Sequence, residues 1–391
     1  MRIAIRIIQL LVGVLFILSG LVKANDPLGL SYKMQEFFEI WNFELQSSSF
    51  FAKNALISLF KQLHGGSLGL SVAMITLEIV AGVALLIGWR KKAVLWILLA
   101  LIIFFTFLTG YAYLSTHPDG SPKFTNCGCF GDCLPIPPLA SFSKDIALVI
   151  LIALLLLGQK FIQPLFSIRG GTAAVLTTLL LSLLFQWYAL SYGPPVDCLP
   201  FKKGNSIPEK MKAPPGSRPD SVAMRFIYEK NGKEYEFTME SFPPDLSTYT
   251  YKDRIDKVIR KGNAEPPIKG FTLIGADQTD STQIVLQQPR AVIVFILSST
   301  DIKKWAGALK EVATAAAKSQ VPVYLATAQK TELEAALNIQ GLPLPVFACD
   351  YTVIRTAART NPGFYLLRNG TIEMKTGHLR AGELVTQLTK R

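Results

Sequence analysis

The sequence predicts an α-helical membrane bundle followed by an α/β domain. Half of the 391 residues are hydrophobic and the mean hydropathy is +0.33, which is unusual for a soluble protein. The long apolar runs all lie between residue 1 and about residue 190, whereas residues from about 200 to 391 are mixed and polar. After residue 268, short apolar segments alternate with segments of helical periodicity, which is typical of an α/β domain.

Five apolar runs approach the length that a helix needs to cross a bilayer, about 20 residues. The first run follows Arg2 and Arg6 and therefore resembles a signal peptide. Its apolar part is longer than a usual signal core, and Lys23 fits a cleavage site poorly, so we interpret it as a retained helix. The predicted spans, four bundle helices and a fifth, are Ile3–Val22, Leu68–Gly88, Ala93–Leu114, Ile146–Ile162 and Gly171–Leu190.

Basic residues predict the orientation of these spans, because cytoplasmic loops carry an excess of Lys and Arg. The run Arg90–Lys92 joins the second and third spans, and Lys160 and Arg169 lie between the fourth and fifth. We therefore predict a multi-pass protein of the inner (plasma) membrane, with a cytoplasmic N-terminus and a periplasmic or otherwise extracytoplasmic C-terminal domain. The net charge of +12 does not indicate nucleic-acid binding, because many basic residues flank membrane segments. The predicted partner is the lipid bilayer.

Two features of the apolar half lie outside the simple pattern of spans. Residues 25–66 spread aromatic side chains among polar ones, which predicts amphipathic helices at the interface or over the end of the bundle. Glu78 lies inside the second span, where a carboxylate normally faces the bundle interior, a cavity or a partner. Two interpretations of Glu78 stay open. One is proton handling or head-group binding beside a reactive centre, and the other is a structural carboxyl that is protonated or hydrogen-bonded.

The segment after the last span predicts a linker and a small β region. Cys198 follows the span closely, and residues 204–220 are rich in Pro, Gly and Ser, which is typical of a linker. A strand pattern that alternates about Asn231-Gly232 predicts a β-hairpin. The pattern of residues 251–262 predicts a helix.

The C-terminal segment predicts the order strand, helix, strand, helix, strand and hairpin. This order resembles the thioredoxin-like fold, and Pro362, just before the predicted strand Phe364–Leu367, matches the cis-proline of that family. The preceding predicted elements are Ala291–Leu297, Lys303–Lys318, Val321–Ala326, Thr331–Leu337 and Val346–Ala348.

The thioredoxin-like resemblance implies a C-x-x-C sequence after the first long strand, but this chain has S-S-T-D-I-K-K at residues 298–304. We therefore predict a thioredoxin-like domain without its active-site dithiol. Cys349 stands alone at a strand end, and we interpret it as a buried free cysteine.

The first half resembles the DoxX/MauE family of small membrane proteins. Three sequences carry the resemblance: F-I-L-S-G-L-V-K-A in the first span, L-E-I-V-A-G-V-A-L-L-I-G-W-R in the second, and C-G-C-F-G-D-C before the fourth. The resemblance implies a four-helix bundle, redox work near the membrane and a role in methylamine utilisation. The predicted division is a bundle in residues 1–162 with an exterior cysteine loop in 115–144, a fifth helix and exit in 163–200, a linker with hairpin and helix in 201–267, and a thioredoxin-like domain in 268–391.

Three of the five cysteines lie in the exterior loop, at Cys127, Cys129 and Cys133. One glycine separates Cys127 from Cys129, so a bond between them closes a small strained ring, and strained disulfides are good oxidants. Cys133 offers a resolving or resting partner, and Cys198 lies on the same predicted side of the membrane. That side is oxidising. Four cysteines allow three full pairings, and the sequence does not choose among them.

These features predict a membrane-bound thiol–disulfide redox protein. Cys127 and Cys129 are the predicted reactive pair, with Cys133 and Cys198 as shuttle or resting partners. If it is an enzyme, it is a thiol–disulfide oxidoreductase that passes electrons between exterior cysteines and a membrane acceptor. A quinone between the helices near Glu78 is the candidate acceptor, and an exterior thiol protein is the candidate partner.

Three other interpretations stay open. The first is a non-enzymatic envelope assembly or scaffold protein, with structural disulfides and a thioredoxin-like fold that binds a partner. The second is a zinc site built from the loop thiols and His117; we predict no metal site, because an exterior loop favours disulfides. The third is a small-molecule transporter, for which five helices and one buried acid are the only indications.

Overall fold

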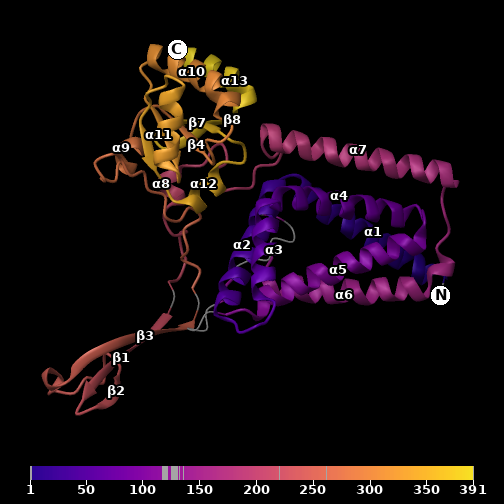
Figure 1. The fold of residues 1–391 in the computed structure, drawn as a ribbon, viewed down its shortest axis with the longest axis horizontal. Coiled ribbons are helices and arrows are strands. Elements are labelled where there is room, and N and C mark those ends of the chain that lie inside the picture. Colours follow the sequence, from indigo (N-terminus) through magenta and orange to yellow (C-terminus); the bar gives the residue numbers. More distant parts are fainter. Residues whose placement is uncertain are drawn as a thin grey trace.

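The chain folds into a bundle of long helices with an α/β domain at one end, as drawn in Figure 1 of the computed structural model. The structure describes residues 2–116, 122–124, 131, 133–134, 136–219, 221–260 and 262–390. Within these residues, five helices are long and apolar enough to cross a membrane. The predicted fold class, a membrane helix bundle with a C-terminal α/β domain, is confirmed. The five helices are α1 (Arg2–Ala24), α4 (Ser67–Leu86), α5 (Lys91–Leu114), α6 (Pro138–Leu157) and α7 (Ile168–Tyr192).

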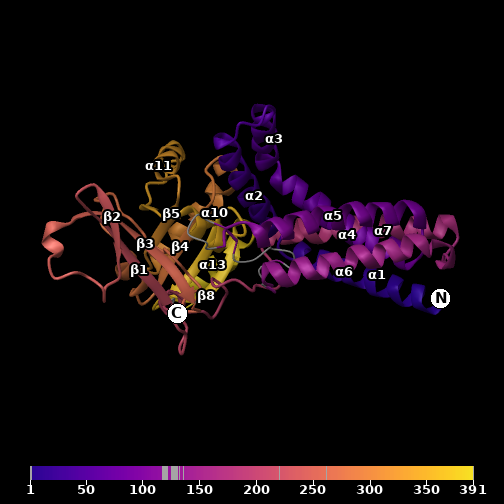
Figure 2. The same cartoon turned by 90° about the horizontal axis from the view of Figure 1, so that it is seen from below.

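Two further helices, α2 (Pro27–Ser47) and α3 (Lys53–Gly65), lie across one end of the long helices (Figures 1 and 2). The Asp26 side chain caps α2 by accepting a hydrogen bond from the Gly29 backbone N–H, and a proline at the first helical position suits this start. The two helices cap the bundle, as the aromatic pattern of residues 25–66 predicts. Three buried side chains of α2 belong to the bundle core, and they are Met34, Phe37 and Phe38.

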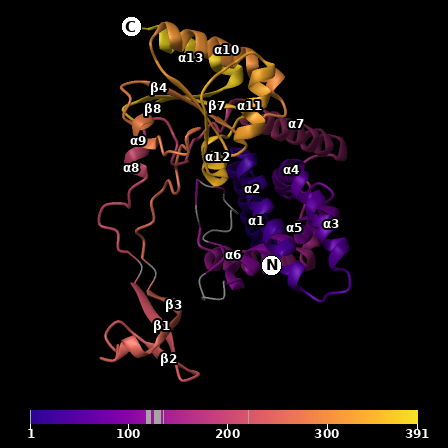
Figure 3. The same cartoon turned by 60° about the vertical axis from the view of Figure 1, so that its left-hand side comes forward.

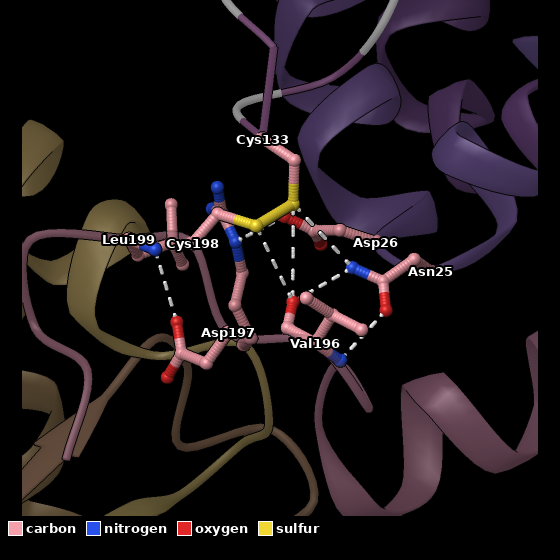
Figure 4. The surroundings of a disulfide bond; sticks show 8 residues. Asn25, Asp26, Cys133, Val196, Asp197, Cys198 and Leu199 are labelled. Atoms are coloured by element: carbon pink, nitrogen blue, oxygen red, sulfur yellow. Dashed lines mark hydrogen bonds and ion pairs between the residues drawn. A yellow bond between two sulfur atoms is a disulfide. The ribbon is translucent and has the colours of Figure 1, made fainter.

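The two ends of the bundle hold different parts of the chain. At the end with the N-terminus, basic side chains bind the connection between α6 and α7. Arg6 donates to the Gln163 side chain at 3.0 Å, and Lys91 donates to the Ile162 carbonyl at 2.7 Å. At the opposite end lie α2, α3, Cys133 and the α/β domain (Figures 1 and 4). The Cys133 loop and the C-terminal domain therefore share one end, whereas the side of the membrane that this end faces stays a prediction.

The fourth span differs from its prediction. Helix α6 begins at Pro138, so the predicted bounds Ile146–Ile162 are wrong at both ends. Ser141 falls in the predicted exterior loop 115–144 and Asp145 directly follows that loop, but both side chains are fully buried. Asp145 accepts a hydrogen bond from the Thr109 hydroxyl of α5 at 3.0 Å, so a polar turn can lie inside the bundle.

The α/β domain contains a five-stranded sheet in the order β6-β5-β4-β7-β8. The central strand β4 is parallel to β5 and antiparallel to β7, and all six of its residues are buried because helices cover both faces. Helices α10, α11 and α13 pack on one face, and α8, α9 and α12 pack on the other. The strands are β4 (Ala291–Ile296), β5 (Val323–Thr327), β6 (Val346–Ala348), β7 (Gly363–Arg368) and β8 (Thr371–Gly377). The helices are α8 (Ile207–Lys210), α9 (Thr282–Leu286), α10 (Ile302–Lys318), α11 (Lys330–Ile339), α12 (Tyr351–Ala357) and α13 (Ala381–Thr389).

A separate three-stranded sheet projects away from both the bundle and the α/β domain (Figures 1 and 3). Its β1–β2 hairpin turns at Asn231 and Gly232, which both have positive φ, so the hairpin prediction is confirmed. The helix predicted for residues 251–262 is wrong, because this segment is a strand that pairs with the free edge of β1. The mixed polar pattern of this segment fits either a helix or a strand, and its pairing with the distant strand β1 makes it a strand. The strands are β1 (Ser221–Lys230), β2 (Lys233–Phe237) and β3 (Thr250–Arg260).

Helices α1 and α4 approach closely because glycines line their contact. A Cβ at Gly82 of α4 would lie 2.8 Å from Ile17 Cγ1 and 2.9 Å from the Gly13 carbonyl oxygen of α1. A Cβ at Gly20 would lie 2.5 Å from Ile79 Cγ1. Small residues at such contacts let two membrane helices pack backbone to backbone. This contact holds the first helix of the chain in the bundle.

Replacing Gly82 tests this packing. We expect Gly82→Ala to lower the free energy of unfolding by about 1–3 kcal/mol, since the added methyl group overpacks the contact. Gly69→Ala in the same helix is the matched control, because nothing lies within 4 Å of a Cβ there. Thermal unfolding in detergent, followed by tryptophan fluorescence, measures both. Equal melting temperatures for the two variants would show that the α1–α4 contact tolerates a side chain.

Candidate functional site

A buried ion pair joins the end of α1 to the middle of α4. The Lys23 ammonium lies 2.5 Å from Glu78 Oε1, and the two side chains are 2% and 1% exposed. Lys23 also donates to the Ser19 hydroxyl at 3.0 Å and lies 4.3 Å from the ring centre of Phe105. The Glu78 carboxylate thus has a cationic partner inside the bundle, while its Oε2 atom has no hydrogen-bond partner among the described residues.

A second acid lies beside this pair. Asp145 of α6 is fully buried, accepts from the Thr109 hydroxyl and lies 2.5 Å from the Lys144 ammonium. Lys144 and Asp145, together with Lys23 and Glu78, line a cavity of about 20 Å³. That volume holds about one water molecule. The quinone predicted near Glu78 does not fit there, because a ring is many times larger than the cavity.

Immediately beyond Lys23, the end of α1 contacts a disulfide. Cys133 and Cys198 are bonded to each other, with their Cα atoms 4.9 Å apart. The Asn25 side-chain amide donates to the Val196 carbonyl and accepts from the Val196 backbone N–H, both at 2.9 Å. Asn25 Nδ2 also lies 3.8 Å from Cys133 Sγ. Figure 4 shows how Asn25 lies between the two segments that the disulfide joins.

Of the three remaining cysteines, the structure describes only Cys349. Cys127 and Cys129, the predicted reactive pair, lie outside the described residues, and so does His117. Cys349 is a free, buried cysteine, as its sequence context predicts. Burial, together with the Asp350 charge, raises the pKa of the Cys349 thiol to about 12, so it is protonated and unreactive at neutral pH. Within the described residues no group of three or more His, Cys, Asp and Glu side chains is placed to hold a metal ion.

The α/β domain is attached to α2 by two arginines. Arg359 Nε lies 2.7 Å from Asp26 Oδ2, and this pair is almost fully buried. Arg355 donates to the Tyr32 carbonyl at 3.0 Å and lies 4.2 Å from the centre of the Tyr32 ring. Burial raises the pKa of Tyr32 to about 12 despite the neighbouring arginines, so its phenol stays neutral. Asp26 follows Asn25 directly, so one turn of chain contacts both the disulfide and the domain.

The loop before β7 contacts the segment where a thioredoxin-like domain would carry its dithiol. The peptide bond between Asn361 and Pro362 is cis. The Asn361 side chain accepts from the Leu297 backbone N–H at 3.0 Å and donates to the Ser298 carbonyl at 2.7 Å. Ser298 in turn shares a hydrogen bond with the Thr300 hydroxyl. The loop and the segment are thus joined by hydrogen bonds between groups that have no redox chemistry.

Sequence reasoning found Glu78 but missed Lys23, Asp145, Asn25 and Arg359. In the sequence, Lys23 stands out only as part of a poor cleavage site and of the F-I-L-S-G-L-V-K-A resemblance, and Asp145 falls between the predicted exterior loop and the predicted fourth span. A lysine at the end of one span and an acid within another is the signal that would have suggested a pair, because charges at membrane depth are normally paired.

Comparison with known proteins agrees with the membrane half of this description. Residues 1–162 match the family model described as methylamine utilisation protein MauE. Residues 222–261, which contain most of the projecting sheet, match a model described as a domain of unknown function (DUF8463). No curated protein and no solved structure matches the chain. The N-terminal half is therefore MauE-like, and with five apolar helices the chain is a multi-pass membrane protein.

The buried pair gives a stability prediction. Glu78→Leu alone leaves the Lys23 ammonium buried without a partner, and we expect a loss of about 3–5 kcal/mol in the free energy of unfolding. The double variant Lys23→Met/Glu78→Leu should lose less than this single variant, because no unpaired charge remains. Denaturant unfolding in detergent measures the cycle.

A matched control for this cycle is the pair between Lys33 and Glu36, which has the same 2.5 Å contact but side chains 16% and 39% exposed. Removing one member there should cost about 0–1 kcal/mol. A double Lys23/Glu78 variant that is less stable than Glu78→Leu would contradict the pairing.

The disulfide gives a labelling prediction, made in a Cys127→Ser/Cys129→Ser background so that only described cysteines remain. Native protein should take no maleimide tag at pH 7, because Cys133 and Cys198 are bonded and the Cys349 thiol is buried and protonated. Adding Cys198→Ser should expose one taggable thiol, counted by mass spectrometry. Two tags on the native background protein would show that the bond is absent.

Proposed function

We propose that the chain is a membrane-bound thiol–disulfide oxidoreductase that passes electrons from an exterior thiol protein to a lipid-soluble quinone. The observation that carries the proposal is the Cys133–Cys198 disulfide, held against the end of α1 next to a buried pair of ionisable side chains. A disulfide in contact with the end of a membrane helix can exchange with exterior thiols while its electrons pass toward the bilayer.

The proposed reaction has two balanced steps. In the first, two thiols of the partner form a disulfide, and the Cys127–Cys129 disulfide is reduced to two thiols by exchange through a mixed disulfide. In the second, these two thiols form their disulfide again, and two electrons with two protons convert a quinone to a quinol. In the shuttle form of this scheme, the Cys127 and Cys129 thiols first reduce the Cys133–Cys198 disulfide by one more exchange, and the Cys133 and Cys198 thiols then reduce the quinone. In the resting form, the Cys133–Cys198 bond stays intact in both steps.

The buried acids support a role in proton transfer. Oxidation of a dithiol releases two protons, and a group that accepts them in a dry interior needs an available oxygen. Glu78 Oε2 has no hydrogen-bond partner among the described residues, and Glu78 lines the water-sized cavity that Asp145 also lines. We therefore assign proton handling, rather than a purely structural role, to Glu78.

The α/β domain fits the role of a binding module in this scheme. The segment from Ser298 contains no thiol, so the domain does not exchange disulfides there. Its attachment through Arg359 and Asp26 keeps it beside the Cys133–Cys198 bond, where it can hold an exterior thiol protein. The predicted resemblance to the thioredoxin-like fold agrees with a role in binding a protein partner.

The location of this end outside the cytoplasm is part of the proposal. Basic residues gather at the other end of the bundle, where Arg6 and Lys91 bind the connection between α6 and α7. Cytoplasmic ends carry such an excess. The match to the family described as methylamine utilisation protein MauE further suggests methylamine utilisation as the setting of this function.

The same disulfide favours a second candidate function, a non-enzymatic envelope scaffold. Cys133 and Cys198 are 65 residues apart in sequence, and their bond ties the exterior loop to the segment after α7. A cross-link of this kind stabilises a fold without any turnover.

Quinone reduction by purified protein separates the two functions. Protein in proteoliposomes is given dithiothreitol as the thiol and decylubiquinone as the acceptor, and quinol formation is followed by absorbance. We expect turnover in the wild type, and no rate above protein-free liposomes for Cys127→Ser or Cys129→Ser. Cys349→Ser, which removes only a buried thiol, should keep the wild-type rate. Wild-type turnover in both loop variants, or none in the wild type, would leave the scaffold function.

A further inference from the structure

A polar pocket of about 280 Å³ lies where α7 meets the α/β domain, apart from the buried cavity beside Glu78. Figure 1 shows the end of α7 beside β8 of that domain. The Arg380 guanidinium joins the two parts, because it donates to the Tyr188 hydroxyl of α7 at 3.1 Å. The pocket has many times the space that one water molecule needs, so it has room for a ligand group.

Positive charge dominates the lining of this pocket. Of the described residues that line it, four are basic and one is acidic. The acid is Asp197, whose carboxylate lies 2.8 Å from the Lys375 ammonium. Arg359, a second basic lining residue, is paired with Asp26. These two ion pairs involve two of the four basic residues, so the lining keeps a positive excess.

The other two basic residues, Lys203 and Arg380, are available to a ligand. Lys203 is exposed, and it forms no hydrogen bond or ion pair with a described residue. Arg380 Nε lies 4.0 Å from Glu383 Oε1, which is too long for a hydrogen bond. A guanidinium has five N–H groups, and the Tyr188 hydroxyl accepts from one of them. The pocket therefore presents two positive charges to an anion.

Aromatic side chains at the end of α7 form one wall of the pocket. Tyr188 and Tyr192 lie one turn apart, and Arg380 Cζ is 5.8 Å and 4.6 Å from the centres of their rings. Trp187 is exposed, and its ring lies edge-on to that of Tyr192. Tyr and Trp are enriched where a membrane helix passes through the layer of lipid head groups. The pocket therefore lies at the level of these head groups.

An exposed apolar face of α7 leads from the bilayer to this pocket. Leu184 and Leu181 lie one and two turns before Tyr188 on the same face of the helix, and both are exposed. Gln186 lies on the opposite face and donates to the Thr76 hydroxyl of α4 at 2.8 Å. The leucine face therefore points away from the bundle, toward acyl chains.

We propose that this pocket binds the head group of an anionic phospholipid, with the phosphate between Lys203 and Arg380 and an acyl chain along Leu181 and Leu184. Phosphate oxygens accept charge-assisted hydrogen bonds from both cations. A zwitterionic lipid fits worse, because its own cationic group would enter a pocket that already has a positive excess. The proposal goes beyond the redox function and does not rest on it.

Two other anions share the charge of this ligand but not its apolar part. A soluble phosphate ester satisfies Lys203 and Arg380, but it leaves the apolar face of α7 unused. An acidic segment of a protein partner does the same, since that face lies within the bilayer. The apolar face beside the cationic pocket therefore favours the lipid. A lipid bound there links the α/β domain to the membrane next to α7.

Photolabelling of the full chain in dodecylmaltoside tests the proposal. The probe is phosphatidylglycerol with a diazirine on one acyl chain. It should label peptides of α7, and unlabelled phosphatidylglycerol should compete with it, whereas phosphatidylcholine should not. Lys203→Gln/Arg380→Gln should raise the apparent Kd at least about tenfold, because each basic residue contributes to the binding of an anionic lipid. The matched control Lys310→Gln/Lys318→Gln removes the same charge from exposed sites on α10 and should label as the wild type does.

A single variant guards against a loss of fold. Arg380 contacts α7 without any ligand, whereas Lys203 has no hydrogen bond or ion pair to lose. Lys203→Gln alone should therefore keep the wild-type melting temperature and raise the apparent Kd at least about threefold. An unchanged Kd in both this variant and the double variant would overturn the proposal.

The competitors distinguish the lipid from the other anions. Equal competition by phosphatidylcholine would overturn the proposal, because the site would then not select charge. Glycerol 3-phosphate that competes as strongly as phosphatidylglycerol would assign the pocket to a soluble phosphate ester. Competition by hexaglutamate where phosphatidylglycerol fails would assign it to an acidic protein segment. Each of these results leaves the redox function standing, since quinone reduction tests that function separately.

Discussion

The buried ion pair between Lys23 and Glu78 is the contact on which the arrangement of the disulfide end of the bundle depends. A single charge at this depth is strongly disfavoured, so each side chain requires the other. The pair therefore fixes the end of α1 against α4, supported by the close glycine contact between the same helices. Asn25 and Asp26 follow Lys23 in the chain, so their positions at the disulfide and at Arg359 are set by this pair.

Two ion pairs hold the C-terminal domain to this end, and a disulfide holds the segment that leads into it. The Asp26–Arg359 ion pair joins it to the start of α2, and the Lys375 ammonium lies 2.8 Å from the Asp197 carboxylate, directly before Cys198. The disulfide adds a covalent link between the loop and the same segment. Burial alone would lower the pKa of Lys375, but its contacts with Tyr365 and Asp197 outweigh burial and raise that pKa above its usual value. This lysine therefore stays charged beside the Asp197 carboxylate at neutral pH.

The sequence predicts the structural features that follow from a local residue pattern, and it does not predict those that follow from contacts between distant segments. The length of the apolar runs predicts the five long helices, and the Asn231-Gly232 pair predicts the hairpin. Residues 251–262 carry no strong pattern, and only the edge of β1 makes them a strand. Asp145 precedes the predicted fourth span, and no local pattern shows that it is buried, because its partner Thr109 lies on another helix. Of the candidate site, Glu78 was predicted from its depth alone.

The size of the cavity beside Glu78 and Asp145 limits what these buried acids can do in the proposed mechanism. The cavity holds about one water molecule, which is enough to relay a proton but not to admit a quinone ring. Phe105 of α5 lines the cavity and contacts Lys23, so an apolar ring lies directly beside the ion pair. In the proposed second step the quinone therefore takes up its two electrons and two protons outside this cavity, and the part that Glu78 and Asp145 can play is to pass protons toward it.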